Sequence, residues 1–132
     1  MQDSLMIHNT VIRQKIRELE GYEVKTEGDS FMVVFGSLLN SVRFALELQS
    51  SLLTADWPEQ ILQWPGCNEE RSSNGTLLWR GMRVRVGIHV GFPTYQVDPV
   101  TGRMDYLGSP INKAARVTQM AAGKSFTHSK AN

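Results

Sequence analysis

Charged and polar side chains surround one predicted turn, at Gly28 and Asp29, and could do chemistry there. Lys25 and Glu27 come just before the turn, and the apolar run Phe31–Phe35 follows it. A carboxylate at the start of a buried strand is held rigidly, and its oxygens could bind a hard cation such as Mg²⁺. Glycine and aspartate are also ordinary turn residues. Composition alone therefore favours the plainer interpretation, a turn without a metal.

A second group with chemical potential is the pair Asn112 and Arg116. The two residues are four positions apart, which places them on one face of a predicted helix. An amide beside a guanidinium could hold a ribose and a phosphate, because the planar arginine fork matches phosphate oxygens. A solvated helix face explains the same pair equally well, so both interpretations stay open. For His89, which has no visible partner, we favour a structural role.

The elements that must position these residues are predicted from apolar periodicity and from turn residues. Helical spacing favours a first helix that Gly21 caps, and Ser37 opens a second helix. The predicted elements are a helix over 3–20, a hairpin over 22–35, a helix over 37–53, a strand over 82–89, a loop or hairpin over 91–104 and a helix over 107–122. The expected inward residues of the second helix are Leu38, Val42, Ala45, Leu46, Leu48, Leu52 and Leu53. This order indicates an α+β domain with helices packed on an antiparallel sheet.

Residues 56–80 hold prolines, glycines and asparagines, and they predict a long surface insertion with a short strand at 76–79. Its three tryptophans suggest local packing more than an aromatic binding patch. Cys67 is the single cysteine of the chain, so no internal disulfide is possible and a reducing, intracellular setting is expected.

The composition of the chain argues against several classes of protein. Fourteen Lys and Arg residues balance thirteen Asp and Glu residues, for a formal net charge of +1, which predicts no binding to nucleic acid. No apolar run approaches the roughly 20 residues of a membrane helix, so we expect no membrane insertion by this segment. The sequence has no phosphate-binding Walker loop, no nucleophile elbow, no zinc-protease motif and no dinucleotide fingerprint.

Three segments, in order, resemble the catalytic domain of class III nucleotide cyclases, and most closely that of fungal adenylate cyclases. They are Glu23–Met32 (EVKTEGDSFM), Arg83–Gly91 (RVRVGIHVG), and Met104–Gly108 (MDYLG) continued by Asn112–Val117 (NKAARV). The resemblance extends from about residue 5 to residue 123. It implies a ferredoxin-like α+β fold and the conversion of ATP to cyclic AMP and pyrophosphate.

The resemblance also implies a role for each site residue. Asp29 would be one of two aspartates that bind Mg²⁺ or Mn²⁺. Lys25 and Asp105 would read adenine, whose ring nitrogen accepts from lysine and whose exocyclic amine donates to aspartate. Asn112 would orient the ribose, and Arg116 would stabilise charge on the phosphate. The site would form between two domains, so a homodimer, or a heterodimer with another cyclase catalytic domain, is implied.

The chain departs from the family at both ends. The expected first strand, which would carry the other metal-binding aspartate, is missing, and Asp3 is not in its context. We therefore expect a partial domain over residues 1–123, without the C-terminal strands of the family, and a divergent, disordered tail over 124–132. On these grounds the chain alone is expected to be weakly active or inactive. The parent protein is expected in the cytoplasm or at the cytoplasmic face of a membrane.

Three rival interpretations remain. An inactive cyclase-homology domain would dimerise with a complete domain and regulate it. A guanylate cyclase would prefer GTP, which the pair Lys25 and Asp105 argues against. An unrelated α+β scaffold would require three motifs to align in order by chance.

Overall fold

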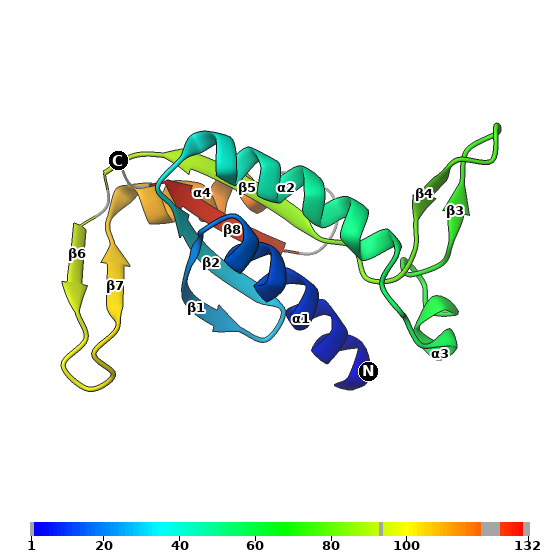
Figure 1. Cartoon of the computed structure of the whole chain (residues 1–132), viewed down its shortest axis with the longest axis horizontal. Helices are drawn as coiled ribbons and strands as arrows, with labels where there is room; N and C mark the ends of the chain where they lie inside the picture. The colour runs from blue at the N-terminus through cyan, green and yellow to red at the C-terminus, as the bar shows by residue number, and fades with distance from the viewer. Residues whose placement is uncertain (1, 93, 120–124, 131–132) are drawn as a thin grey trace.

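A four-stranded sheet forms the centre of the fold (Figure 1). The computed structural model describes residues 2–92, 94–119 and 125–130. The strands of this sheet follow the order β1 (Tyr22–Glu27), β2 (Ser30–Phe35), β8 (Ser125–Lys130) and β5 (Arg85–Val90). β1 and β2 pair antiparallel around the predicted Gly28-Asp29 turn, whereas β8 pairs parallel with both β2 and β5.

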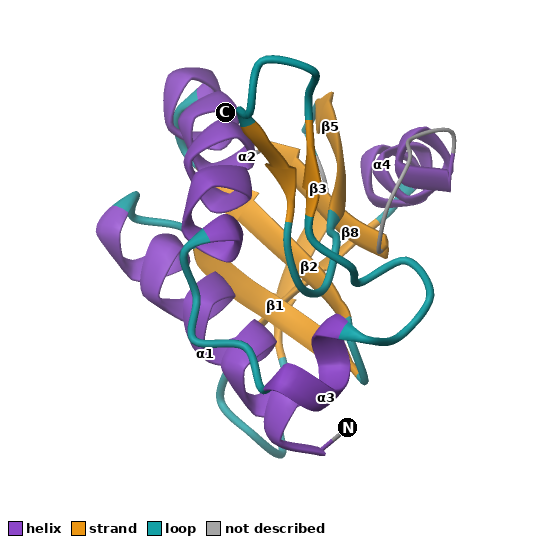
Figure 2. Cartoon of the chain, turned by 90° about the vertical axis from the view of Figure 1, so that its right-hand side faces the viewer, coloured by secondary structure: helices purple, strands orange, loops and turns teal. Residues whose placement is uncertain are grey.

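Helices cover both faces of the sheet (Figure 2). Helices α1 (Gln2–Glu18) and α2 (Leu38–Leu53) pack together on one face, and α4 (Ser109–Gln119) packs against β5 and β8 on the other. The predicted α+β class, with helices packed on a sheet, is confirmed. In the described part of the chain, no helix has both the length and the apolar character needed to cross a membrane.

The ends of the first two helices show how local sequence sets their bounds. The Ser37 side chain accepts a hydrogen bond from the Asn40 backbone N–H at 3.3 Å, which confirms the predicted start of α2. The end of α1 differs from the prediction, because Glu20 rather than Gly21 has the positive φ, 60°. Gly21 is needed for space instead, since a Cβ there would lie 2.7 Å from the Phe35 ring.

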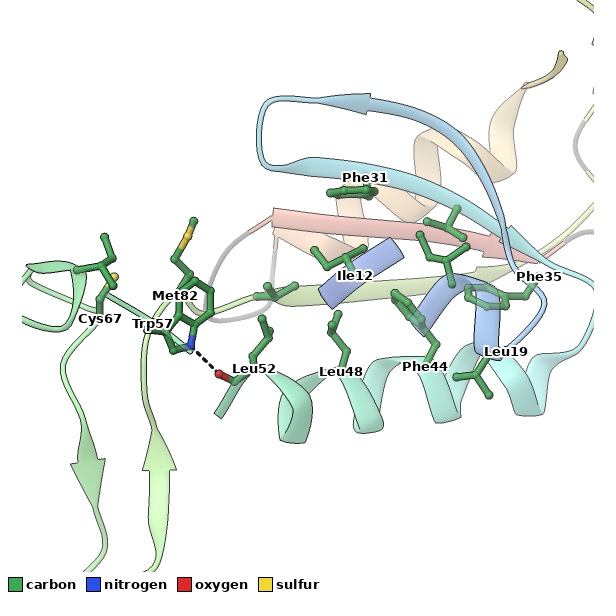
Figure 3. Packing of buried hydrophobic residues seen from close by; sticks show 14 residues of the cluster. Ile12, Leu19, Phe31, Phe35, Phe44, Leu48, Leu52, Trp57, Cys67 and Met82 are labelled. Carbon is green, nitrogen blue, oxygen red and sulfur yellow. Dashed lines mark hydrogen bonds between the residues drawn. The ribbon is translucent and has the colours of Figure 1, made fainter. Parts of the chain in front are cut away.

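The core lies between the sheet and the layer formed by α1 and α2 (Figure 3). On α2, Ser41, Phe44, Leu48 and Leu52 are buried. Leu38, Val42 and Leu46 were expected on the same inward face, but they are exposed. The prediction was wrong for these three because α2 is apolar around more than one side, so periodicity alone does not select the side that meets the sheet.

The insertion forms a small folded unit beside the end of α2. It contains α3 (Glu59–Leu62) and a hairpin of β3 (Glu70–Arg71) and β4 (Leu77–Trp79). Trp57 and Ile61 are buried in the core cluster, so the insertion is not purely a surface loop. The Trp57 indole Nε1 donates to the Leu52 carbonyl at 2.7 Å, which attaches the insertion to the last turn of α2 (Figure 3).

The position of β8 differs from two expectations. The sheet is mixed rather than antiparallel, and residues 125–130 form a strand where a disordered tail was expected. The physical reason is that β2 and β5 would otherwise present unpaired backbone groups to each other between two helix layers. The expected boundary between a domain over 1–123 and a tail falls in the stretch 120–124, outside the described residues, so that division stays a prediction.

Candidate nucleotide site

Lys25 lies on strand β1, in the β1–β2 hairpin that contains the first of the three family-like segments. The pairing of β1 with β2 shifts register between Glu23 and Lys25, so Val24 is an extra residue in β1. Such a bulge bends the strand and changes the direction in which the next side chains point. Lys25 is exposed, and a long amine on an exposed bulged strand can reach a ligand on either side.

A second hairpin carries Asp105. It consists of β6 (Thr94–Val97) and β7 (Met104–Leu107), which pair antiparallel and place Asp105 opposite Gln96. This two-stranded unit is separate from the four-stranded sheet, and it leads through Gly108 into α4. Asn112 and Arg116 then follow on α4, and both are exposed.

Two adjoining pockets connect these elements, and Lys25 lines both. The first has a volume of about 210 Å³ and lies between the β1–β2 hairpin and the start of α4; it is lined by Lys25, Glu27, Ser30, Met32, Ile111, Asn112 and Ala115. The second, of about 270 Å³, lies between β1 and the β6–β7 hairpin; it is lined by Val24, Lys25, Asp98, Thr101, Arg103, Met104 and Asp105. Lys25 thus lines one pocket together with Asn112 and the other together with Asp105.

Asp29 and Arg116 are not among the residues that line these two pockets. Asp29 occupies the turn between β1 and β2 and is partly exposed. No cluster of three or more His, Cys, Asp or Glu residues suited to a metal is found in the described part of the chain. Asp29 fits the role of a single carboxylate ligand, since Mg²⁺ in nucleotide sites is often bound by one or two carboxylates together with phosphate oxygens.

The backbone of β1 next to Lys25 is held by an ionic cluster at Glu23. The Glu23 carboxylate accepts from Arg13 Nε at 3.0 Å and Nη2 at 3.1 Å, and from the Thr26 hydroxyl at 2.5 Å. Burial is the largest single influence on the pKa of Glu23 and raises it, but the bonds from Arg13 and Thr26 and the nearby arginine charges outweigh it. The pKa of Glu23 is therefore lowered, and the residue holds β1 in its charged form.

Sequence reasoning missed Arg103, which lines the second pocket, and Tyr22, which contacts two of the residues that line it. The Tyr22 hydroxyl accepts from the Met104 backbone N–H at 3.0 Å, and the Arg103 guanidinium lies 5.1 Å from the centre of the Tyr22 ring. The sequence offered one signal for them, their closeness to the residues predicted to bind adenine. Tyr22 is three residues before Lys25, and Arg103 is two residues before Asp105. Nothing local in the sequence shows that β1 and β7 meet.

Comparisons with known proteins agree with this architecture. The family profile described as the adenylate and guanylate cyclase catalytic domain matches residues 1–131. The chain is 43% identical over 130 residues to an adenylate cyclase of Mycosarcoma maydis, which covers 98% of this chain and 5% of that protein. It is 45% identical over 128 residues to an adenylate cyclase of Lachancea kluyveri, with 96% of this chain and 7% of that protein covered. This chain therefore spans only a small part of these relatives.

A solved structure extends the likeness to three dimensions. An adenylate cyclase structure from Trypanosoma brucei, described in its monomeric state, superimposes with a TM-score of 0.75 at 30% sequence identity. The match covers 97% of this chain and 63% of that chain.

Proposed function

Because this chain belongs to the adenylate and guanylate cyclase catalytic domain family, we propose that it is part of the catalytic domain of an adenylate cyclase, which converts ATP to 3′,5′-cyclic AMP and pyrophosphate. The observation that carries the proposal is the place of Lys25 between two pockets, one lined with Asn112 and the other with Asp105. A purine in contact with Lys25 and Asp105 would leave its ribose within reach of α4.

The base is recognised by a donor and an acceptor. The Lys25 ammonium donates to a ring nitrogen of adenine, and the Asp105 carboxylate accepts from its exocyclic amine. Guanine carries a carbonyl at the position of that amine and would place an acceptor against Asp105. A site that hydrogen-bonds one base rejects the other because its own polar groups are then left unpaired.

The reaction itself is an in-line displacement at the α-phosphorus. The ribose 3′-oxygen forms a bond to this phosphorus and releases its proton to solvent, the bond to the bridging oxygen breaks, and pyrophosphate carries away the electron pair. Asn112 orients the ribose so that the hydroxyl faces the phosphorus, and Arg116 stabilises the charge that develops on the phosphate oxygens. Bound Mg²⁺ or Mn²⁺, with Asp29 as one ligand, would supply charge neutralisation at the phosphates.

The proposed assembly is a dimer of cyclase catalytic domains, either two copies of this chain or this chain with another such domain. Asp29 does not itself line the pockets that Lys25 lines, although Glu27 and Ser30 on either side of it line the first one. In the proposed assembly, Asp29 of one chain serves the nucleotide bound to the other. We place this reaction in the cytoplasm or at the cytoplasmic face of a membrane, through the parent protein.

Nucleotide binding tests the proposal without requiring turnover. We would titrate the purified chain with ATP and with GTP in the presence of Mg²⁺ and follow backbone amide shifts by NMR. ATP should bind more tightly than GTP, and it should shift residues of both pockets. Lys25→Ala and Asn112→Ala should each weaken ATP binding about tenfold, the loss of roughly one hydrogen bond to a charged or oriented group.

A matched control is Lys113→Ala, which removes another exposed charge from the same helix. It should leave ATP binding within twofold of the wild-type chain. Equal affinity for ATP and GTP would refute the site. An equal loss of ATP affinity in Lys25→Ala, Asn112→Ala and the Lys113→Ala control would also refute it. A parallel assay for cyclic AMP, with Mn²⁺ and a high concentration of chain, tests catalysis. If the chain forms no cyclic AMP but associates with a complete cyclase domain, the alternative of an inactive regulatory domain would be favoured.

A further inference from the structure

The β6–β7 hairpin contacts β1 through a small set of side chains that the proposed chemistry does not use. The Met104 backbone N–H donates to the Tyr22 hydroxyl at 3.0 Å. Arg103 Nη2 donates to the Glu23 carbonyl oxygen, and its guanidinium lies 5.1 Å from the centre of the Tyr22 ring. The rings of Tyr22 and Tyr106 meet edge to face, with their centres 6.1 Å apart. We call Tyr22 and Arg103 together the hairpin clamp.

The clamp matters because, among the described residues, the hairpin packs against little besides β1 and α4. All four residues of β6 are exposed, and Val100 near the hairpin tip is 91% exposed. The hairpin forms a separate two-stranded unit that does not pair with the four-stranded sheet. A β-hairpin alone is marginally stable in water, so its position relative to β1 depends strongly on the few contacts it makes there.

The clamp joins the hairpin to the part of β1 that is hydrogen-bonded through Glu23. The Glu23 carbonyl that accepts from Arg103 belongs to the residue whose carboxylate Arg13 and Thr26 bind. The register shift of β1 comes directly after this residue and before Lys25. Arg103 thus links the β6–β7 hairpin to Glu23, the residue of β1 that directly precedes the bulge before Lys25.

We propose that Tyr22 and Arg103 are positioning residues that set the preference for adenine over guanine. Arg103 directly precedes β7 and lies two residues before Asp105, and Tyr22 lies three residues before Lys25 on β1. The pocket that Arg103 lines contains both Asp105 and Lys25. By fixing β7 against β1, the clamp fixes the spacing between the donor and the acceptor that read the base edge. Discrimination between hydrogen-bonding patterns is lost when such a spacing relaxes. This inference rests on the function proposed above.

Two variants and one control separate positioning from general stability. Tyr22→Phe keeps the ring and removes only the hydroxyl that accepts from Met104, and Arg103→Met keeps the side-chain length and removes the guanidinium. The control is Arg71→Met, because Arg71 also donates to a backbone carbonyl within a hairpin, that of Gly75, but in the insertion. Circular dichroism of each variant checks that the chain is folded.

The first readout is hydrogen exchange at the Met104 amide, which needs no nucleotide. Tyr22→Phe and Arg103→Met should each speed this exchange, and Arg71→Met should not. The second readout is the ratio of the GTP and ATP dissociation constants. Each clamp variant should lower this ratio roughly three- to tenfold, as expected for one hydrogen bond. In an Asp105→Ala background, the clamp variants should cause no further loss, because the residue they position is gone.

Several results would overturn the inference. Faster exchange with an unchanged ratio would show that the clamp holds the hairpin without affecting base selection. If a clamp variant and Asp105→Ala lower the ratio of the GTP and ATP dissociation constants additively, the clamp acts through general stability. A wild-type chain without preference for ATP would refute the proposed function and with it the role in selection, whereas the exchange measurement would still report on the contact itself.

Discussion

Substitution of Gly87 by alanine tests the packing that holds α4, and therefore Asn112, against the sheet. Gly87 lies in β5, where a Cβ would meet Thr118 of α4: it would lie 2.5 Å from the Thr118 backbone nitrogen and 2.8 Å from its Cα. Ordinary van der Waals contact begins at 3.4 Å, so α4 would have to withdraw by about 0.9 Å at this point. The backbone of a helix cannot rotate out of the way as a side chain can.

The expected magnitude follows from this withdrawal. Ala114 and Thr118 are fully buried on the face of α4 that meets the sheet, so their packing loosens when the helix moves. Gaps of 0.5 to 1 Å lose roughly a quarter to a half of the dispersion energy of a contact. Overpacking of this kind costs about 1–3 kcal/mol, and an alanine offsets up to about 1 kcal/mol by restricting the unfolded chain. We expect a net destabilisation of about 1–2 kcal/mol, with a melting temperature lower by roughly 3–12 °C.

Urea unfolding, followed by circular dichroism, measures this effect. The matched control is Gly36→Ala, because a Cβ at Gly36 would have no atom within 4 Å and the residue has no positive φ. Gly36→Ala should leave the midpoint unchanged or raise it slightly. Adding Thr118→Ala to Gly87→Ala should give no rescue, since the new Cβ would still clash with the backbone of residue 118. A Gly87→Ala chain as stable as the control, or full rescue by Thr118→Ala, would refute the reasoning.

Two further predictions concern other parts of the fold. Trp57→Phe should lower the free energy of unfolding by about 1–3 kcal/mol in urea denaturation, because it removes the indole donor to the buried Leu52 carbonyl; a stability equal to wild type would show that water replaces the bond. The lowered pKa of Glu23 means that its charged form stabilises the fold above the ordinary value of 4.5, and that this stabilisation is lost as the pH falls through the lower, folded-state pKa. The difference in unfolding free energy between the wild-type chain and Glu23→Gln should therefore be constant near neutral pH and shrink below about pH 4.5; a difference that does not depend on pH down to pH 2 would contradict the ionic role of Glu23.

Much of the fold was predictable because it rests on local rules. The first helix, the β1–β2 hairpin, the start of α2 at Ser37 and the last helix all follow from periodicity, a cap or a turn, each within a few residues. The motif residues were predictable for a different reason. Their types and order resemble a known family, and the family profile matches nearly the whole chain.

Other features depend on contacts between distant segments. The side of α2 that faces the sheet could not be predicted from its sequence, because apolar residues occur on several sides of the helix. Only packing against the sheet buries Phe44 and leaves Leu46 exposed. Strand β8 was missed because Ser125–Lys130 is mostly polar and lacks the alternation of a strand. It forms by pairing with β2 and β5, whose edges no single-segment argument can bring together.

The sequence by itself determined which chemical groups this protein can offer a nucleotide: an amine at Lys25, carboxylates at Asp29 and Asp105, an amide and a guanidinium four residues apart on one helix. Only the tertiary structure decided that Lys25 lines one pocket with Asp105 and another with Asn112, through a bulge in β1 and the contacts of Tyr22 with β7. The physical reason is that residue type and helical spacing are local properties of the chain. The distance between two strands is set by side chains that meet only after folding.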